Sequence, residues 1–383
     1  MNFELSDDHK AIRQLARNFS ESDLKETASK WDQEKKFPHE LVPKLAELGF
    51  MGMSIPEEYG GSDLDLLSCA IVMEEVARHC GSTALTLASH NGLGSKHILE
   101  FGNEAQKKKY LPDIAAGKKL SAWALTEPGS GSDASGMKTV AVEEKDCFVL
   151  NGSKAFITQG SVGDVYLVLA KTSPEKRQKG VSAFIIEKGT PGFTPGKPED
   201  KLGCRGSDTS TLSLDNVRVP KENLVGERDM GFIDTLKILD KGRVIIGAMA
   251  LGLGRGALEE SIRYAKEREQ FGQPIANFQA IQWKLANMAT ELEAARLLLY
   301  RACYLHREGR SINTEASMAK LFASEAGLKA CDEAIQIHGG YGYIKDYPVE
   351  RYWRDCRICT IGEGTSEVQR MIISRNILRG QGG

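Results

Sequence analysis

The spacing of apolar residues divides the chain into a helical region, a strand-rich region and a second helical region. Across residues 1–120, apolar positions recur every three or four residues, which places them on one face of an α-helix. Leu41 and Leu45 belong to such a stripe, between a proline that favours a helix start and a glycine that favours a helix end. The helices predicted here span 38–49, 65–79 and 104–116, after a first helix that Ser6 caps.

Residues 121–226 instead contain short runs of β-branched and aromatic residues, which are typical of strands. Asn151-Gly152 separates two such runs, and because this dipeptide is a favoured hairpin turn, we predict a β-hairpin there. Pro220 ends the last predicted strand. The remaining strands are predicted at 165–170, 181–187 and 211–220.

From residue 227 onward the pattern is helical again. One long helix is predicted from eight apolar residues whose spacing alternates between three and four, as in helices that pack in bundles. These residues are Phe278, Ile281, Leu285, Met288, Leu292, Ala295, Leu299 and Ala302. Further helices are predicted at 315–337 and at 367–377, the second opened by Thr365 and Ser366. The chain is therefore predicted to be α+β, with a β domain (121–226) between helical domains at 1–120 and 227–383.

Composition and charge exclude several classes of protein. With 383 residues, 41% of them hydrophobic, the chain suits one large domain or two to three ordinary ones. Its formal net charge of -2 gives no sign of a surface for nucleic acid or membrane. No apolar run approaches the ~20 residues that cross a bilayer, and the start lacks the features of a signal peptide. We expect a cytoplasmic bacterial protein; the mitochondrial matrix is the weaker alternative because the sequence begins with Met.

The spacings of cysteines and glycines could suggest a metal site and a dinucleotide-binding loop, and we predict neither. Cys356 and Cys359 form the only CxxC among eight cysteines, and a zinc site needs a second ligand pair. We therefore predict free structural thiols and no metal. Gly252, Gly254 and Gly256 do not fit the dinucleotide fingerprint, which needs its third glycine one residue later. We interpret them as glycines at close helix contacts.

The main candidate for chemistry lies in residues 355–370. Glu363 stands between Gly362 and Gly364 just before a helix start, where glycines let a flat ligand approach the backbone. Taken alone, the segment also fits an ordinary loop beside a helix cap. With four further blocks it resembles the acyl-CoA dehydrogenase family, especially short-chain and branched-chain members. These blocks, in the family's order and spacing, are IPEEYGG (55–61), LTEPGSGSD (125–133), REQFGQPI (268–275) and HGGYGY (338–343).

This resemblance implies a third domain that is a four-helix bundle, and a homotetramer built as a dimer of dimers. It also implies FAD, bound at a site that two subunits share. The residues that it assigns to FAD are Trp123, Leu125, Thr126, Ser132, Phe156, Thr158, Arg268, Gln270, Phe271, Gln279, Gln336, Gly339, Gly340, Thr365 and Glu367. Those that it assigns to the acyl-CoA substrate are Ser132, Asp240, Arg243, Gly362 and Gly364. Asp240 and Arg243 equally fit an intrahelical ion pair, because their spacing of three puts both on one helix face.

The resemblance further implies an oxidoreductase reaction of fatty-acid metabolism. Glu363 would remove the α-proton of an acyl-CoA thioester, the β-hydrogen would pass as hydride to flavin N5, and an electron-transfer flavoprotein would take the electrons. The backbone N–H of Glu363 and a ribityl hydroxyl of FAD would stabilise the enolate oxygen. Burial of the carboxylate should raise its pKa toward the working pH.

Gly362 departs from the family pattern, because straight-chain enzymes usually carry Tyr there. Loss of this ring predicts a wider acyl pocket and a short branched or cyclic acyl group. Compensation by another side chain would instead leave a straight short-chain substrate such as butyryl-CoA. Three other functions fit less well: an acyl-CoA oxidase, whose chain is usually much longer; a flavin monooxygenase, which lacks the base; and a flavin-free scaffold or binding protein.

Overall fold

Side-chain oxygen atoms cap the start of three helices of the first region in the computed structural model, which describes residues 4–380. The longer helices here are α1 (Asp7–Phe19), α2 (Ala28–Glu34), α3 (Val42–Glu47), α4 (Leu66–Ala77), α5 (Gly81–Ser89), α6 (Ser95–Phe101) and α7 (Glu104–Ala115). Ser6, Asp65 and Asn103 each accept a hydrogen bond from a backbone N–H of the first turn, at α1, α4 and α7. The helix predicted at 38–49 is shorter, because a 3₁₀ turn precedes α3.

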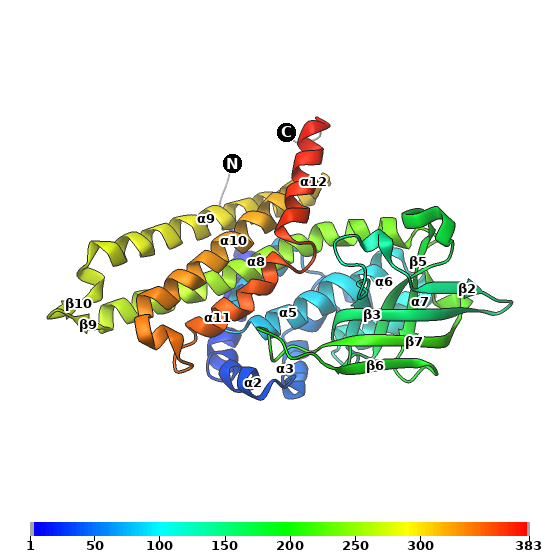
Figure 1. The fold of residues 1–383 in the computed structure, drawn as a ribbon, viewed down its shortest axis with the longest axis horizontal. Coiled ribbons are helices and arrows are strands. Elements are labelled where there is room, and N and C mark those ends of the chain that lie inside the picture. The colour runs from blue at the N-terminus through cyan, green and yellow to red at the C-terminus, as the bar shows by residue number, and fades with distance from the viewer. Residues whose placement is uncertain (1–3, 381–383) are drawn as a thin grey trace.

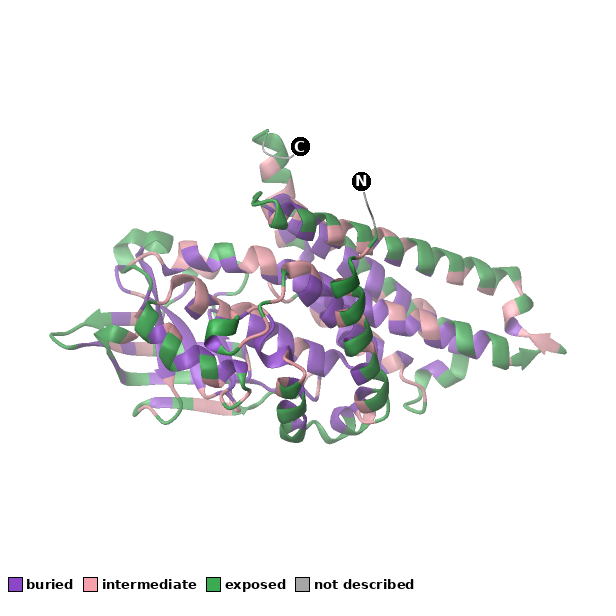
Figure 2. Cartoon of the chain, turned by 180° about the vertical axis from the view of Figure 1, so that it is seen from behind, coloured by how far each residue is buried: buried purple, intermediate pink, exposed green. Residues whose placement is uncertain are grey.

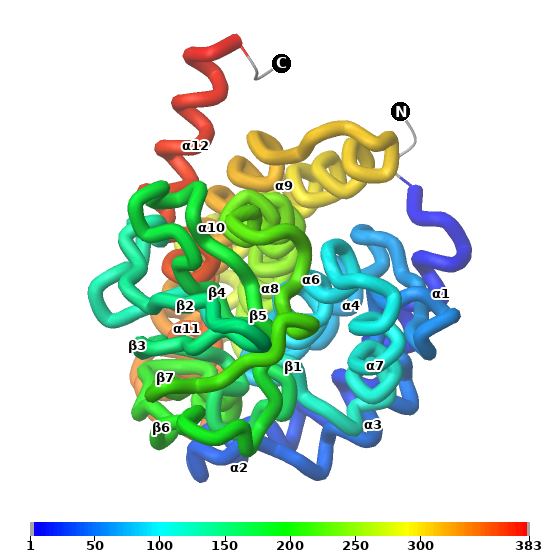
Figure 3. Tube along the Cα trace, turned by 90° about the vertical axis from the view of Figure 1, so that its right-hand side faces the viewer, coloured from blue at the N-terminus to red at the C-terminus, as the bar shows by residue number. Residues whose placement is uncertain are grey.

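Within residues 4–380 the middle region forms an eight-stranded sheet. Seven strands run in the order β6-β7-β3-β2-β4-β5-β8, and β1 pairs in parallel with β4 beside this path. The strands are β1 (Ser121–Ala124), β2 (Val140–Glu143), β3 (Cys147–Thr158), β4 (Val165–Lys171), β5 (Val181–Glu187), β6 (Phe193–Pro198), β7 (Thr209–Pro220) and β8 (Leu224–Val225). Figure 3 views the molecule from the end that carries this sheet, with the long helix α8 seen end-on beside it.

The prediction of a hairpin at Asn151-Gly152 is wrong. β3 continues through this dipeptide and pairs with β2 on one side and β7 on the other. Its register shifts between Leu150 and Gly152, where a Cβ atom would lie 2.8 Å from Cα of Thr139. The glycine therefore permits a close approach to the neighbouring backbone at Thr139, and no turn is needed.

The described part of the last region, up to residue 380, contains five α-helices and one short hairpin. They are α8 (Gly231–Glu267), β9 (Glu269–Gln270), β10 (Gln273–Pro274), α9 (Gln279–Arg307), α10 (Asn313–His338), α11 (Val349–Cys356) and α12 (Ser366–Leu378). The 37 residues of α8 span ~55 Å, so α8 joins the sheet at one end of the molecule to the β9–β10 hairpin at the other (Figure 1). Gly252 and Gly256 of α8 lie directly against the backbone of α4 and of Arg78, which confirms them as glycines at close helix contacts.

Buried apolar side chains form three clusters. The largest joins the N-terminal helices to the C-terminal bundle, one lies between α6, α7 and the sheet, and one lies on the other face of the sheet. Figure 2 shows the resulting pattern, in which the long helices are buried on their inner faces and exposed on their outer faces. All eight cysteines are buried and free. Among the described residues, no helix is long and apolar enough to cross a membrane.

Candidate active site

Glu363 lies on a tight turn between two elements of the C-terminal region. A 3₁₀ turn (Arg357–Thr360) follows α11, and α12 starts after Thr365, whose side chain accepts a hydrogen bond from the Val368 N–H as predicted. Glu363 has a φ of 54° and Gly364 a φ of 97°. A positive φ is costly for a residue with a side chain and is found preferentially at functional sites. The turn therefore holds Glu363 in a specific, strained orientation.

The carboxylate of Glu363 rests against α8. Its Oε2 atom is buried and has no hydrogen-bond partner within residues 4–380. It faces Gly242, where an added Cβ would lie 2.8 Å from Cδ of Glu363 and still closer to Oε2. Glycine at 242 thus makes room for the carboxylate, and any larger residue would displace it.

The surroundings of Glu363 change its acidity. Burial raises the pKa of its carboxyl group from 4.5 to about 7, against the opposing effect of Lys320 and Arg243. A carboxyl group with this pKa exists in both protonation states near neutral pH, which suits a general base or acid. The predicted rise in pKa toward the working pH thus has its physical cause in the structure.

The backbone of Glu363 offers a second chemical group. No residue among 4–380 accepts a hydrogen bond from its N–H. A free N–H beside a buried carboxylate can donate to an oxygen on which negative charge develops. Base and donor come from one residue, so the left-handed turn fixes both together.

Gly362 leaves open space beside this turn. A Cβ atom there would meet only Ile358, at 3.5 Å from its carbonyl oxygen and 3.8 Å from Cγ1. Both distances are ordinary van der Waals contacts, and the φ of Gly362 is not in the left-handed region. A side chain would therefore be tolerated at 362, and its absence leaves that volume to a ligand.

Asp240 and Arg243 form the intrahelical pair that their spacing allowed. Arg243 Nη1 donates to Asp240 Oδ1 at 2.6 Å, and Asn313 donates to the same oxygen at 2.7 Å. The Arg243 side chain is buried, so it stands beneath the site, not on an open surface. Ser132, the other residue assigned to the substrate outside the Glu363 turn, is exposed.

A second group of predicted residues lies on the sheet. Trp123, Leu125 and Thr126 stand at the end of β1, and the buried Trp123 Nε1 has no hydrogen-bond partner within the described chain. Phe156 has a φ of 57° at a register shift of β3, and its side chain is 69% exposed. The bulge thus leaves the aromatic ring of Phe156 exposed at the surface of the sheet. Thr158 follows at the end of β3.

A buried ion pair that the sequence did not reveal fixes the loop after β1. Lys154 Nζ donates to Glu127 Oε1 at 2.8 Å and to the Leu125 carbonyl at 3.1 Å. Glu127 also accepts from the backbone N–H groups of Lys138 and Thr139. Because all these groups are satisfied, the loop is held at both ends. Glu and Lys 27 residues apart give no periodic signal, so only the structure shows the pair.

The third group of predicted residues lies at the far end of α8. Five of them line a cavity of about 610 Å³ between the β9–β10 hairpin and the end of α10, and the other two, Gln279 and Gln336, are next in sequence to the lining residues Phe278 and Ile337. The group consists of Arg268, Gln270, Phe271, Gln279, Gln336, Gly339 and Gly340. Arg268 lies over the ring of Tyr341, and Phe271 is 94% exposed. Within one chain this group is separated from the sheet by the length of α8 (Figure 1).

A further cavity that the sequence did not predict borders Gly242. Its volume is about 310 Å³, and its lining includes Lys96, Lys241, His306 and Arg307 beside apolar side chains. These cationic and imidazole groups come from α6, α8 and α9, and no motif connects them in the sequence. Thr365 and Glu367, the last predicted residues, lie at the start of α12, and Glu367 is exposed.

The sequence matches known protein-family models along most of its length. Models described as the N-terminal, middle and C-terminal domains of acyl-CoA dehydrogenase match residues 6–118, 122–217 and 229–378. The chain belongs to the acyl-CoA dehydrogenase family. It is thus an oxidoreductase, and its order of helical, sheet and helical regions is that of the family.

Relatives and solved structures agree over almost the full length. A 3-(aryl)acrylate reductase of Clostridium sporogenes is 47% identical over 98% of this chain and 99% of its own. A caffeyl-CoA reductase-Etf complex subunit of Acetobacterium woodii is 48% identical, also over 98% of this chain and 99% of its own. The structure of butyryl-CoA dehydrogenase from Megasphaera elsdenii, 43% identical, superposes with a TM-score of 0.97 and covers 99% of this acyl-CoA dehydrogenase and 100% of its own chain.

Proposed function

We propose that this chain is an FAD-dependent acyl-CoA dehydrogenase in which Glu363 removes the α-proton of an acyl thioester. The observation that carries the proposal is a carboxylate whose buried Oε2 atom faces Gly242 and has no hydrogen-bond partner within residues 4–380, with a pKa of about 7. A carboxylate left unpaired in a fold of this size is costly unless it has a function. The α-proton moves to Glu363, and the electron pair of the broken Cα–H bond becomes the second bond to the β-carbon.

The remaining groups of the turn support this proton transfer. The thioester oxygen carries negative charge while the α-proton leaves, and the free N–H of Glu363 donates to it. FAD, when bound, accepts the β-hydrogen together with its electron pair. A pKa near 7 also suits the reverse reaction, in which protonated Glu363 returns a proton to the α-carbon of an enoyl thioester. The reductase names of two relatives support this reverse direction as well.

The sheet surface fits a flat, polar ring system. Phe156 presents an exposed ring, and the unpartnered Trp123 Nε1 is a buried donor. In the loop after β1, a Cβ at Gly129 or Gly131 would meet nothing within 4 Å, so the backbone there is open to a ligand. Trp123, Leu125, Thr126, Phe156 and Thr158 would hold the ring portion of FAD.

The separation of the predicted residues supports a site made by two subunits. Arg268 and its neighbours at the far end of α8 are out of reach of the sheet in the same chain, so a second chain would bring them to the FAD. Phe271 and Tyr343 are 94% and 89% exposed at this end of the molecule, which is unusual for aromatic side chains unless another chain covers them. We therefore propose a homotetramer, arranged as a dimer of dimers.

An electron-transfer flavoprotein is the proposed electron partner. The Etf complex of the Acetobacterium woodii relative supports this choice. A cytoplasmic location remains a prediction from the sequence.

The open space at Gly362 favours a short branched or cyclic acyl group over a straight chain. A ring or branch beside the α-carbon needs volume next to Glu363, and Gly362 leaves it. The aryl substrate in the name of one relative supports this choice, and the butyryl group in the name of a second supports the straight-chain alternative. Both candidates use the same base and differ only in the width of the pocket.

Anaerobic titration of the purified protein with acyl-CoAs tests the proposal. The panel contains butyryl, isobutyryl, isovaleryl, glutaryl, octanoyl, cyclohexanecarboxyl and 3-arylpropionyl thioesters, and the readout is bleaching of the oxidised flavin band. The matched variant Gly362→Tyr should lower the rate with branched and cyclic members relative to butyryl-CoA by about tenfold, or ~1.4 kcal/mol. Equal relative rates in the two proteins would reject the wide pocket. A protein without flavin, or one that no thioester bleaches, would reject the dehydrogenase.

A further inference from the structure

A buried lysine lies beneath the turn that carries Glu363. Lys320 belongs to α10, its side chain is fully buried, and its Nζ donates a hydrogen bond to the Gly364 carbonyl oxygen at 2.6 Å. A buried ammonium is expensive unless it is paired, so such a residue needs an explanation. Its one hydrogen-bond acceptor within the described chain is the residue next to Glu363.

A neutral side chain holds the same carbonyls from the other side. Gln369 of α12 is fully buried, and its Nε2 donates to the Gly364 carbonyl at 2.9 Å and to the Glu363 carbonyl at 3.3 Å. The positive φ angles of Glu363 and Gly364 turn these carbonyls into the protein, where Lys320 and Gln369 satisfy them. The strained turn is therefore anchored to α10 and α12.

Lys320 differs from Gln369 because it carries a charge close to Glu363. The other charged or titratable groups around them are Arg243 on α8, Cys359 on the preceding 3₁₀ turn and Glu367 on α12. Arg243 is already paired with Asp240, the thiol of Cys356 and burial raise the pKa of Cys359 well above its usual value, and Glu367 is exposed. Lys320 thus differs from Arg243, because no carboxylate within the described chain forms an ion pair with it.

We propose that Lys320 is a positioning residue for Glu363, which fixes the turn through the Gly364 carbonyl and favours the charged form of the carboxylate. The inference rests on the proposed role of Glu363 as the base. Lys320 and Arg243 both oppose the burial that raises the pKa of Glu363, and burial lowers the pKa of Lys320 itself to about 8. Without the ammonium, burial would protonate Glu363 over more of the neutral range.

Two matched variants separate the geometric role from the electrostatic one. Lys320→Met keeps the length of the side chain but removes both the charge and the donor, and Gln369→Met removes a donor from the same carbonyls without changing the charge. The measurement is the pH profile of kcat/KM in the FAD-loaded tetramer. We expect Lys320→Met to move the acidic limb upward by about one pH unit, because a nearby opposite charge shifts a carboxyl pKa by about that much. Gln369→Met should lower kcat and leave the limb in place.

An infrared titration gives a readout that does not depend on turnover. The carboxyl band of Glu363 is identified as the band lost in Glu363→Gln, and its pH midpoint is compared between the wild type and Lys320→Met. An upward shift in midpoint supports the proposal, and an unchanged midpoint and limb overturn it. Lys320→Arg, which keeps the charge, serves if Lys320→Met does not fold: its limb should stay in place while kcat falls. A wild type that oxidises no acyl-CoA would reject the proposed function, and the infrared midpoint would still decide the effect of Lys320.

Discussion

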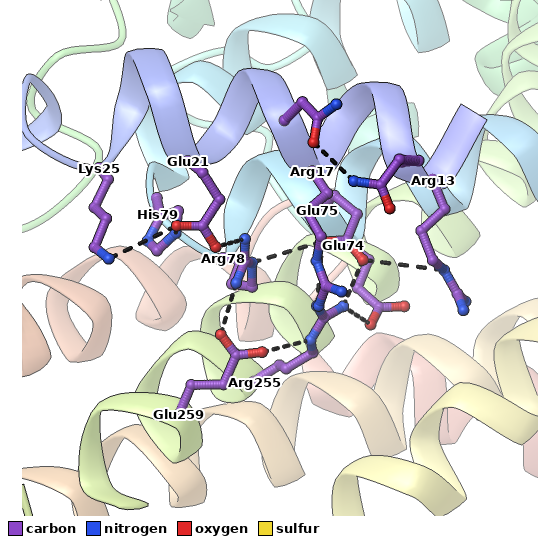
Figure 4. A network of polar contacts seen from close by, with 12 residues as sticks. Arg13, Arg17, Glu21, Lys25, Glu74, Glu75, Arg78, His79, Arg255 and Glu259 are labelled. Carbon is purple, nitrogen blue, oxygen red and sulfur yellow. Dashed lines mark hydrogen bonds and ion pairs between the residues drawn. The ribbon is translucent and has the colours of Figure 1, made fainter. Parts of the chain in front are cut away.

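Glu74 and Glu75 on α4 and Glu363 on its turn are carboxylates with opposite surroundings. Glu74 and Glu75 of α4 are 2% and 1% exposed, and Arg255 of α8 donates to both at 2.7 Å (Figure 4). Arg296 of α9 donates to Glu74 at 2.8 Å. Glu363 has a buried oxygen with no hydrogen bond within residues 4–380, and the two cations that lower its pKa, Lys320 and Arg243, donate to the Gly364 carbonyl and to Asp240.

The pKa values follow the partners and not the burial. Burial raises the pKa of Glu74, but Arg296 and Arg255 outweigh it and bring the pKa below its usual value. Burial also raises the pKa of Glu363, and there it prevails, to about 7. The first carboxylate is locked in its charged form and joins three helices. The second keeps a proton affinity that chemistry near neutral pH can use.

The largest expected effect is the loss of turnover in Glu363→Gln. Glu363→Gln removes the base and keeps the size of the side chain, so acyl-CoA oxidation should fall by on the order of 10³-fold, ~4 kcal/mol in the barrier. Glu74→Gln should leave the rate per folded, FAD-loaded subunit within about twofold. Rates of flavin bleaching under anaerobic conditions, normalised to bound flavin, measure both. A similar loss in the two variants would remove the distinction between the regions.

The second effect is a loss of stability, and it should appear at Glu74 and not at Glu363. Glu74→Gln leaves the half-buried Arg296 and Arg255 with fewer acceptors, and breaking ion pairs to a buried carboxylate costs about 3 kcal/mol in the free energy of unfolding. Glu293 pairs with the same Arg296 from the surface, so Glu293→Gln serves as the control and should cost less than about 0.5 kcal/mol. Chemical denaturation of the FAD-loaded protein gives both values. Equal losses would show that burial adds nothing to this pair.

The sequence allowed prediction of the elements that local chemistry determines. Ser6 and Thr365 cap helices as expected, and β4 and β5 lie where the β-branched runs predict them. It failed at Asn151-Gly152, where contact with a neighbouring strand overrides the local preference of the dipeptide for a turn. A propensity rule uses only nearby residues, so it could not include Thr139 as a packing partner.

The candidate site divides in the same way. Glu363 and its glycines were visible because a motif carries them, whereas Lys320 is 43 positions away on a helix whose pattern is otherwise ordinary. Its significance depends on the folded distance from its Nζ to the Gly364 carbonyl. Likewise no motif in the sequence marks Glu74 and Arg255, which pair because α4 packs on α8. Sequence patterns identify the residue types present, and tertiary contacts decide which charges are paired.

The smallest effect is on stability: replacing the carboxyl group of Glu363 should stabilise the folded protein. The folded state holds the proton of Glu363 more strongly than the unfolded state, so the free energy of unfolding falls as pH rises from about 4.5 to about 7. Glu363→Gln removes this loss and should stabilise the protein by about 2 kcal/mol at pH 8, since one pKa unit corresponds to about 1.4 kcal/mol and the buried amide offsets part of the gain.

The gain should shrink as the pH falls and vanish well below pH 4.5, where Glu363 is protonated in both states. Glu74→Gln is the matched control, and it should be destabilising at pH 8. Denaturation midpoints of both variants across this pH range measure the difference. A destabilised Glu363→Gln at pH 8 would mean that Glu363 is a satisfied structural carboxylate like Glu74, and the contrast between the two regions would then be wrong.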